Sequence, residues 1–209
     1  MSLYFIEQAR RLVAARDWPA ALEAAERAAV RSPNDARAWY LKSTIETALG
    51  RRAEARESAE RAVAVGSNEA RNWLLAANAA LDVGDRAAAR AACERAVELS
   101  PSWGVAWNRL GTIVFELGDA AGAESAFERA VESDRAHARS WNNLAQARLA
   151  RGRLEAAEEA LKHALAARPD YPLAFRNLAR IAAARGDARS RETYESVATR
   201  LESMDREEP

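Results

Sequence analysis

The chain has 209 residues, enough for one compact domain or one mid-sized repeat array. Basic and acidic residues number 31 each, so no bulk field attracts the chain to nucleic acid or anionic lipid, and no apolar run approaches the roughly 20 residues of a membrane-spanning helix. A single cysteine and an amino terminus without the layout of a signal peptide predict a cytoplasmic protein with no internal disulfide, no nucleic-acid partner and no membrane partner.

One motif of 34 residues recurs six times along the chain. An aromatic residue marks the same place in each copy, at Phe5, Trp39, Trp73, Trp107, Trp141 and Phe175. A second mark follows eleven residues later, at Arg16, Gly50, Gly84, Gly118, Gly152 and Gly186. This unbroken period predicts a single array of six repeats over residues 2–205, namely 2–35, 36–69, 70–103, 104–137, 138–171 and 172–205, with a polar tail at 206–209.

Each repeat has the pattern of two helices, which is clearest in the fourth copy. Leu110 and Val114 belong to an apolar series at three- and four-residue steps, as in one face of a helix. Gly118 ends that helix, because glycine accepts positive φ, and Asp119 suits the N-cap of a second helix that contains Phe127 on its apolar face. No alternation typical of strands appears, so the sequence predicts an all-α fold.

The second repeat departs from this pattern at two positions. Lys42 and Glu46 stand where other repeats have leucine or alanine. Their spacing of four residues places the two side chains on neighbouring turns of one helix face. We therefore expect an ion pair along this helix.

A helix–turn–helix of 34 residues with Trp, Leu-Gly, Gly, Ala, Phe and Pro in this order resembles the tetratricopeptide repeat, and the resemblance covers essentially the whole chain. The resemblance implies an α-solenoid: a right-handed superhelix of antiparallel helix pairs, in which the first helix of each pair lines a concave groove. It also implies a scaffold that binds proteins or peptides and is not an enzyme.

The positions that line the groove in this family are rich in arginine in this chain. They hold seven arginines and three acids: Arg10, Arg37, Arg71, Arg109, Arg139, Arg176 and Arg180 against Glu7, Asp82 and Glu116. Guanidinium groups bind carboxylates through paired hydrogen bonds, and side-chain amides can bond an extended backbone. The predicted peptide-binding residues are Arg71, Asn78, Asn108, Arg109, Arg139, Asn142, Asn143, Arg176, Asn177 and Arg180. The competing interpretation is an ordinary solvated helix face.

Two more specific binding sites come into consideration, one within the groove and one at the edge of the array. The two-carboxylate clamp of chaperone-binding relatives finds its best register at Leu74, Asn78, Arg109, Arg139 and Asn143, where only Asn78 fits fully, so that specificity is not predicted. Trp103, His137 and Tyr171 precede three successive first helices and form either an aromatic contact strip or hydrophobic staples on those helices.

Signatures of catalysis, metal binding and cofactor binding are missing from the sequence. His137 and His163 lie in different repeats without a second ligand at helical spacing, and no glycine belongs to a phosphate-binding loop. Cys93 occupies the apolar position of Phe127 and Leu161, which indicates a buried, inert thiol. We expect no catalytic residue, no metal and no cofactor.

The sequence thus favours a non-catalytic scaffold, with a monomer expected, that binds a protein or peptide of acidic or extended character. An alternative from another class is a regulatory or substrate-recruiting module of a larger enzyme of the transferase or hydroxylase type. A third is a self-assembling structural piece. These alternatives stay open at the level of sequence.

Overall fold

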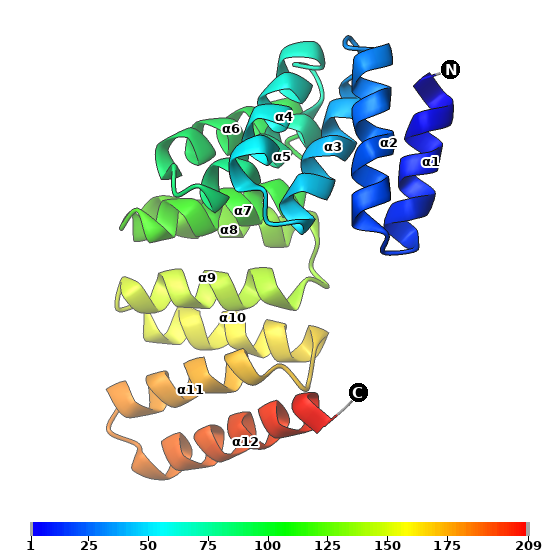
Figure 1. Ribbon diagram of the computed structural model, residues 1–209. Coiled ribbons are helices and arrows are strands. Elements are labelled where there is room, and N and C mark those ends of the chain that lie inside the picture. The colour runs from blue at the N-terminus through cyan, green and yellow to red at the C-terminus, as the bar shows by residue number, and fades with distance from the viewer. Residues whose placement is uncertain (1, 208–209) are drawn as a thin grey trace. The chain divides into compact units, whose positions relative to one another are not determined.

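The computed structural model describes residues 2–207, and side chains within residues 3–204. This part of the chain forms twelve α-helices and no strand, which confirms the predicted all-α fold (Figure 1). The helices are α1 (Ser2–Ala14), α2 (Trp18–Arg31), α3 (Ala36–Ala48), α4 (Arg52–Val65), α5 (Ala70–Asp82), α6 (Arg86–Leu99), α7 (Gly104–Glu116), α8 (Ala120–Ser133), α9 (Ala138–Ala150), α10 (Leu154–Ala167), α11 (Pro172–Ala184) and α12 (Ala188–Glu207). The predicted polar tail is helical at 206 and 207, and residues 208 and 209 lie outside the described residues.

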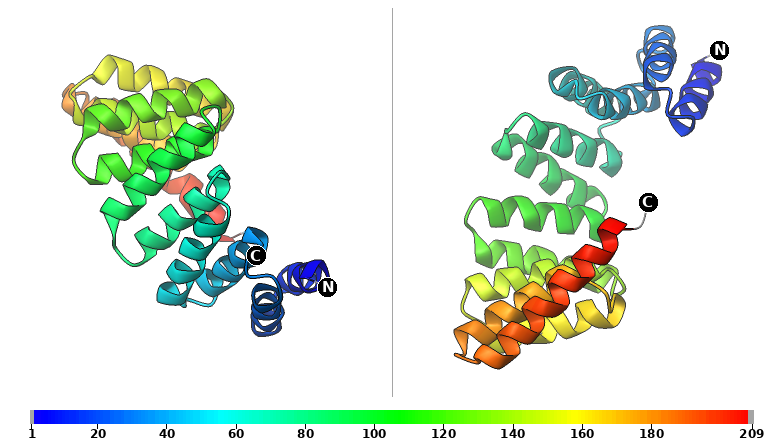
Figure 2. Two further views of the ribbon diagram at one scale, coloured as in Figure 1. Left: turned by 90° about the horizontal axis from the view of Figure 1, so that it is seen from above. Right: turned by 60° about the horizontal axis from the view of Figure 1, so that its bottom comes forward.

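The helices form two compact units, which we call unit 1 (Met1–Pro101, α1–α6) and unit 2 (Ser102–Pro209, α7–α12). In each unit, consecutive helices pack as antiparallel pairs: α1 with α2, α3 with α4, α5 with α6, and likewise from α7 to α12 (Figure 2). The first helix of every pair has 13 residues and the second has 14, except that α12 has 20.

The turn inside each pair requires a left-handed backbone. Gly84 has φ of +82° and Gly118 has φ of +88°, in the region that glycine reaches without steric cost. Arg16 takes the same conformation in the first pair with φ of +59°. The prediction that glycine ends the first helix is therefore confirmed, and the next helix begins at the following cap. Asp119 accepts a hydrogen bond from Gly122 N at 2.8 Å, as expected of an N-cap.

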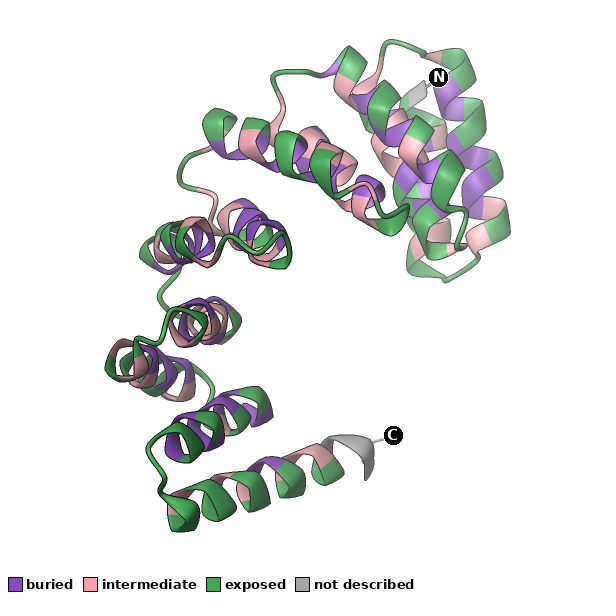
Figure 3. Ribbon diagram, turned by 90° about the vertical axis from the view of Figure 1, so that its left-hand side faces the viewer, coloured by how far each residue is buried: buried purple, intermediate pink, exposed green. Residues whose placement is uncertain are grey.

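Alanine gives the pairs their close packing. The same position of five second helices is fully buried and is alanine in each: Ala21, Ala55, Ala89, Ala123 and Ala157. A small side chain there lets the backbones of neighbouring helices approach closely, and larger residues such as Ile45, Ile113 and Leu144 fill the remaining space. Figure 3 shows the buried residues on the inner faces of the pairs, while the outer face of α12 is exposed.

The irregular second repeat contains the expected ion pair. Lys42 Nζ lies 2.7 Å from Glu46 Oε1 and also donates to Ser58 Oγ at 3.1 Å on α4. Glu46 is only 2% exposed, so this pair lies between the helices of the hairpin instead of on the solvent face. Cys93 is buried as well, in agreement with the prediction of a buried thiol.

A second buried carboxylate joins α8 to α9 and to the turn that follows α9 in unit 2. Glu124 on α8 is 2% exposed and accepts hydrogen bonds from Arg148 at 2.9 Å, from Arg153 at 2.6 Å and from Arg151. Burial raises the pKa of this carboxyl, but the hydrogen bonds and charges of the arginines outweigh burial, and the pKa lies below its ordinary value. The cluster therefore stabilises the fold at neutral pH, and its contribution is lost as the pH falls through that lowered pKa.

The aromatic residues before three first helices occupy N-cap positions. Trp103, His137 and Tyr171 directly precede α7, α9 and α11. Tyr171 is 8% exposed, and His137 Nδ1 lies 2.7 Å from Ser140 Oγ. The side chains of His137 and Tyr171 thus take part in the packing at the helix starts.

Candidate peptide-binding surface

The first helices of the pairs form one face of each unit, which we call the first-helix face. It consists of α1, α3 and α5 in unit 1 and of α7, α9 and α11 in unit 2. Within each unit these helices contact one another as well as their own partners, through α1 with α3, α3 with α5, α7 with α9 and α9 with α11. The second helices have no comparable mutual contacts in the described residues. The first helices therefore lie on the inner side of each stack.

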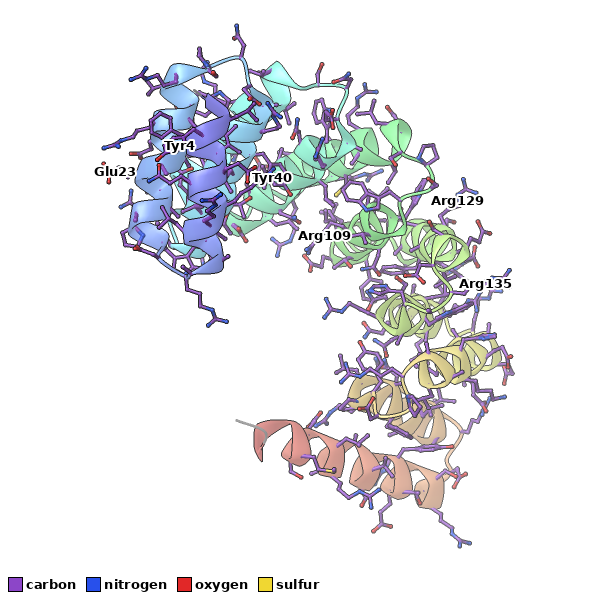
Figure 4. The ribbon with its side chains drawn as sticks, turned by 90° about the vertical axis from the view of Figure 1, so that its right-hand side faces the viewer. Tyr4, Glu23, Tyr40, Arg109, Arg129 and Arg135 are labelled. Atoms are coloured by element: carbon purple, nitrogen blue, oxygen red, sulfur yellow. The ribbon has the colours of Figure 1, made fainter. Side chains whose placement is uncertain are left out.

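Unit 2 presents exposed guanidinium groups on its first-helix face. Arg109 and Arg139 are exposed and have no ion-pair partner among the described residues. Figure 4 shows Arg109 on the opposite side of the α7–α8 pair from Arg129 and Arg135. Arg180 Nη1 donates to Asn177 Oδ1 at 3.1 Å and has no carboxylate partner in the same part of the chain. The guanidinium groups of these three arginines are available to bind a carboxylate ligand.

Arg176 on α11 differs because its guanidinium already binds a carboxylate. Its Nε donates to Glu202 Oε1 at 2.7 Å, and its Nη2 donates to Glu202 Oε2. Glu202 lies on α12, within the part of this helix that extends beyond the length of the other second helices. The paired geometry is the one by which guanidinium recognises a carboxylate.

The predicted amides of unit 2 bond to one another across neighbouring first helices. Asn143 Nδ2 on α9 donates to Asn108 Oδ1 on α7 at 3.1 Å, and Asn177 Nδ2 on α11 donates to Asn142 Oδ1 on α9 at 2.9 Å. Asn142 is 1% exposed and Asn177 is 4% exposed. Sequence reasoning placed all four on the face but missed these two bonds, although both pairs share a separation of 35 residues.

Unit 1 contains a separate pocket of about 840 Å³ on its own first-helix face. Arg10, Arg37, Tyr40 and Arg71 are among its lining residues. The site prediction included only Arg71 of these four, although the 34-residue spacing of Arg37 and Arg71 was visible in the sequence.

Acidic neighbours hold two of the pocket arginines in place. Arg37 donates twice to Asp35, at 2.9 and 2.8 Å, and Arg71 donates twice to Glu69, at 3.0 and 2.8 Å. The hydrogen bond from Arg37 lowers the pKa of the Asp35 carboxyl, against the opposing effect of burial. The pocket of unit 1 is therefore nearly balanced in charge, unlike the face of unit 2.

Two asparagines of α5 have different surroundings. Asn72 is buried and donates to Gly66 O at 3.0 Å, which fixes the loop that forms one wall of the pocket. Asn78, a predicted site residue, is half-buried and does not line the pocket. Its Oδ1 is buried and has no hydrogen-bond partner among the described residues.

The family is decided by a sequence comparison. The sequence model of the tetratricopeptide repeat matches residues 6–70, 74–140, 108–172 and 142–195, so that nearly all of the chain is matched. The chain belongs to the tetratricopeptide repeat family. No curated protein matches this tetratricopeptide repeat (TPR) protein.

Solved structures agree with this TPR fold. The pilF protein of Pseudomonas aeruginosa superposes with a TM-score of 0.82 at 16% identity, over 96% of this chain and 91% of that one. PilW, a type IV pilus biogenesis factor, gives 0.79 at 20% identity over 93% and 90%. YrrB, described as a TPR protein with an unusual peptide-binding site, gives 0.70 at 23% identity over 83% and 90%. At these identities the comparison establishes the fold alone.

Metal-ligand clusters and membrane-spanning helices are both absent from the described residues of this TPR protein. No group of three or more His, Cys, Asp or Glu side chains among them could hold a metal ion. None of the helices in residues 2–207 is both long and apolar enough to cross a bilayer. TPR proteins generally act as non-catalytic scaffolds that bind protein or peptide partners.

Proposed function

We propose that this TPR protein is a non-catalytic scaffold that binds an extended, acidic segment of another protein on the first-helix face of unit 2. One observation supports this most directly: Arg109 and Arg139 are exposed there without a carboxylate partner in the described residues. Several exposed arginines of the second helices differ from them, since Arg27, Arg90 and Arg129 each pair with a glutamate three or four residues away. The unpaired groups have charge available for a ligand.

The Arg176–Glu202 pair supports the choice of ligand. It places a carboxylate from α12 in two hydrogen bonds with a guanidinium of the same face. A glutamate or aspartate of a bound segment would use Arg109, Arg139 and Arg180 in the same way. Such bidentate pairs are stronger than neutral hydrogen bonds and fix the orientation of the ligand.

The asparagines have a supporting role in this proposal. The bond between Asn108 and Asn143 joins α7 to α9, and the bond between Asn142 and Asn177 joins α9 to α11. These bonds fix the spacing of the helices from which the arginines project. A face that is rigid before binding loses less conformational entropy when a ligand is bound. In unit 1, the predicted site residue Arg71 is bonded to Glu69, and Asn78 is half-buried.

Fluorescence anisotropy with a labelled peptide of five Glu-Ala repeats tests this proposal, with the Gln-Ala peptide as the uncharged reference. The double variant R109E/R139E should weaken binding of the acidic peptide at least tenfold, because two attractive contacts become repulsive. Binding of the acidic peptide to the unsubstituted protein should also weaken as the salt concentration rises, since exposed charges are screened beyond about 10 Å at 0.1 M ionic strength.

The matched control is R129E/R135E, which reverses two charges of unit 2 on the other side of the α7–α8 pair. This control should keep the acidic peptide. Loss of binding in the control, with binding kept in R109E/R139E, would place the ligand elsewhere. Equal binding of the Gln-Ala peptide would refute the role of carboxylates.

A further inference from the structure

A hollow of about 320 Å³ lies in unit 1 between α4, α5 and α6. We call it the Trp73 hollow, after the ring that forms one wall. Its lining includes Ala76 and Ala80 of α5, Ala91 of α6, and the charged residues Arg56 of α4 and Arg95 of α6. Because α4 and α6 are second helices, the hollow is distinct from the first-helix face.

The hollow exists because two side chains are short. In unit 2, two repeats later in the sequence, Leu144 takes the place of Ala76 and Arg148 takes the place of Ala80. Leu144 is 1% exposed, and the Arg148 guanidinium donates to Glu124 at 2.9 Å, to Glu128 at 3.0 Å and to Ala156 O at 3.0 Å. The corresponding space between α8, α9 and α10 is therefore filled from within the chain.

The lining determines the chemistry of an occupant. Its alanines are apolar, and the Trp73 indole N–H already donates to Ser67 O at 2.7 Å. Arg56 is bonded to Glu60 at 2.9 Å and to Asp85 at 3.0 Å, and Arg95 is bonded to Glu98. The polar groups that surround the hollow thus have partners, and an occupant with a buried charge would find none.

The size of the missing groups sets the size of an occupant. Leucine exceeds alanine by three non-hydrogen atoms and arginine exceeds it by six, so the hollow lacks about nine such atoms. Its volume of about 320 Å³ is at the small end of the range of ligand pockets. An indole ring or a phenylmethyl group has this size. The Arg95 guanidinium lies over the Trp73 ring, with its Cζ 5.9 Å from the ring centroid. The Trp73 ring beside it favours an aromatic group, because offset or edge-to-face ring contacts add to the burial of apolar area.

We propose that the Trp73 hollow is a binding site for one uncharged aromatic side chain of a partner protein. Apolar side chains beside charges that already have partners are typical of protein interfaces, where aromatic residues inserted into pockets supply most of the binding energy. The site adds a second binding surface to the scaffold and does not depend on the arginines of unit 2.

Titration with N-acetyl-tryptophanamide, followed through the indole N–H resonances of the six ¹⁵N-labelled tryptophans, tests this inference. The variant W73F assigns the Trp73 resonance. The probe should shift this resonance in a saturable way and leave the other indoles nearly unchanged. N-acetyl-argininamide should shift it at least tenfold less at equal concentration, because the hollow has no partner for a charge.

Two variants fill the hollow and one matched control does not. A76L restores the residue type of Leu110, Leu144 and Leu178, and A91L adds the same bulk at an exposed position of α6. Both variants should weaken the binding of N-acetyl-tryptophanamide at least tenfold. A64L adds a leucine at an exposed position of α4 outside the hollow and should leave the titration unchanged.

Three results would overturn the inference. The first is an unchanged titration in A91L, and the second is a larger effect of the arginine analogue than of the tryptophan analogue. The third is binding of free indole without binding of N-acetyl-tryptophanamide, which would indicate a small-molecule site closed to a protein side chain. None of these results depends on the acidic peptide, so they are separate from the test of the first-helix face.

Discussion

At the scale of single residues, packing inside a pair depends on complementary sizes. A Cβ atom added at Gly111 of α7 would lie 2.6 Å from Phe127 Cε1 of α8, which is too close for two carbon atoms. In the next repeat, the larger Ala145 stands in place of the glycine and the smaller Leu161 stands in place of the phenylalanine. The large ring of Phe127 therefore requires the glycine.

We predict that G111A is destabilising in the natural sequence and stabilising beside a smaller partner. The overlap with Phe127 should cost about 1–3 kcal/mol, partly offset by the 0.5–1 kcal/mol that alanine gains over glycine within a helix. When G111A is combined with F127L, the overlap is removed and the gain of alanine over glycine within the helix remains. Urea unfolding of the two single variants and the double variant measures this coupling. Simple additivity of the two changes would show that the residues are independent.

At the scale of helices, aspartate caps distinguish some second helices from others. Asp17, Asp85 and Asp119 accept a hydrogen bond from the backbone N–H three residues later, at 3.2, 3.0 and 2.8 Å. Arg51 holds the same place before α4 and makes no such bond. Its backbone has φ of −82° and ψ of 70°, close to the −84° and 79° of Asp85. An aspartate at position 51 would thus meet the geometry of a cap.

R51D should stabilise the protein by about 0.5–2 kcal/mol, the usual range for an N-cap side chain. The neighbouring variant R52D makes the same change of charge at the first residue of α4, where the side chain cannot cap. R52D should gain only the smaller stabilisation that comes from a negative charge near the N-terminus of a helix. Thermal unfolding compares the two variants, and an equal gain in both would assign the effect to charge instead of capping.

At the scale of the whole molecule, the described helix pairs of each unit contact mainly their neighbours along the chain. In unit 2, α9 contacts α8 and α7, and α11 contacts α10 and α9, while the described residues of α7 and α8 have no substantial contact with α11 or α12. Stability in such an array is approximately the sum of repeat and interface terms. Loss of the last pair should therefore leave the preceding pairs folded.

We predict that a chain ending at Tyr171, without α11 and α12, remains helical and unfolds cooperatively at a lower temperature. The exposed face of α10 lowers the stability, because α11 no longer covers it. Far-ultraviolet circular dichroism gives the helix content, and its temperature dependence gives the midpoint. A truncated chain without helical signal would indicate one global core that every repeat completes.

Features that repeat, or that lie within one turn of helix, could be read from the sequence. The 34-residue period indicated the helix pairs, and Gly118, Asp119, Cys93 and the Lys42–Glu46 pair have the places expected of them. Each depends on the backbone conformation or on the burial pattern of a single helix. Such features follow from local sterics and from helical periodicity.

Contacts between helices were decided only by the tertiary structure. Asn143 reaches Asn108, Glu202 reaches Arg176, and alanines leave the Trp73 hollow where Leu144 and Arg148 fill its counterpart. The sequence by itself indicated which residues share a helix face, but not that Glu202 already binds Arg176. It could not determine which side chains meet, because that depends on the rotation and separation of packed helices, and both follow from the summed fit of many side chains.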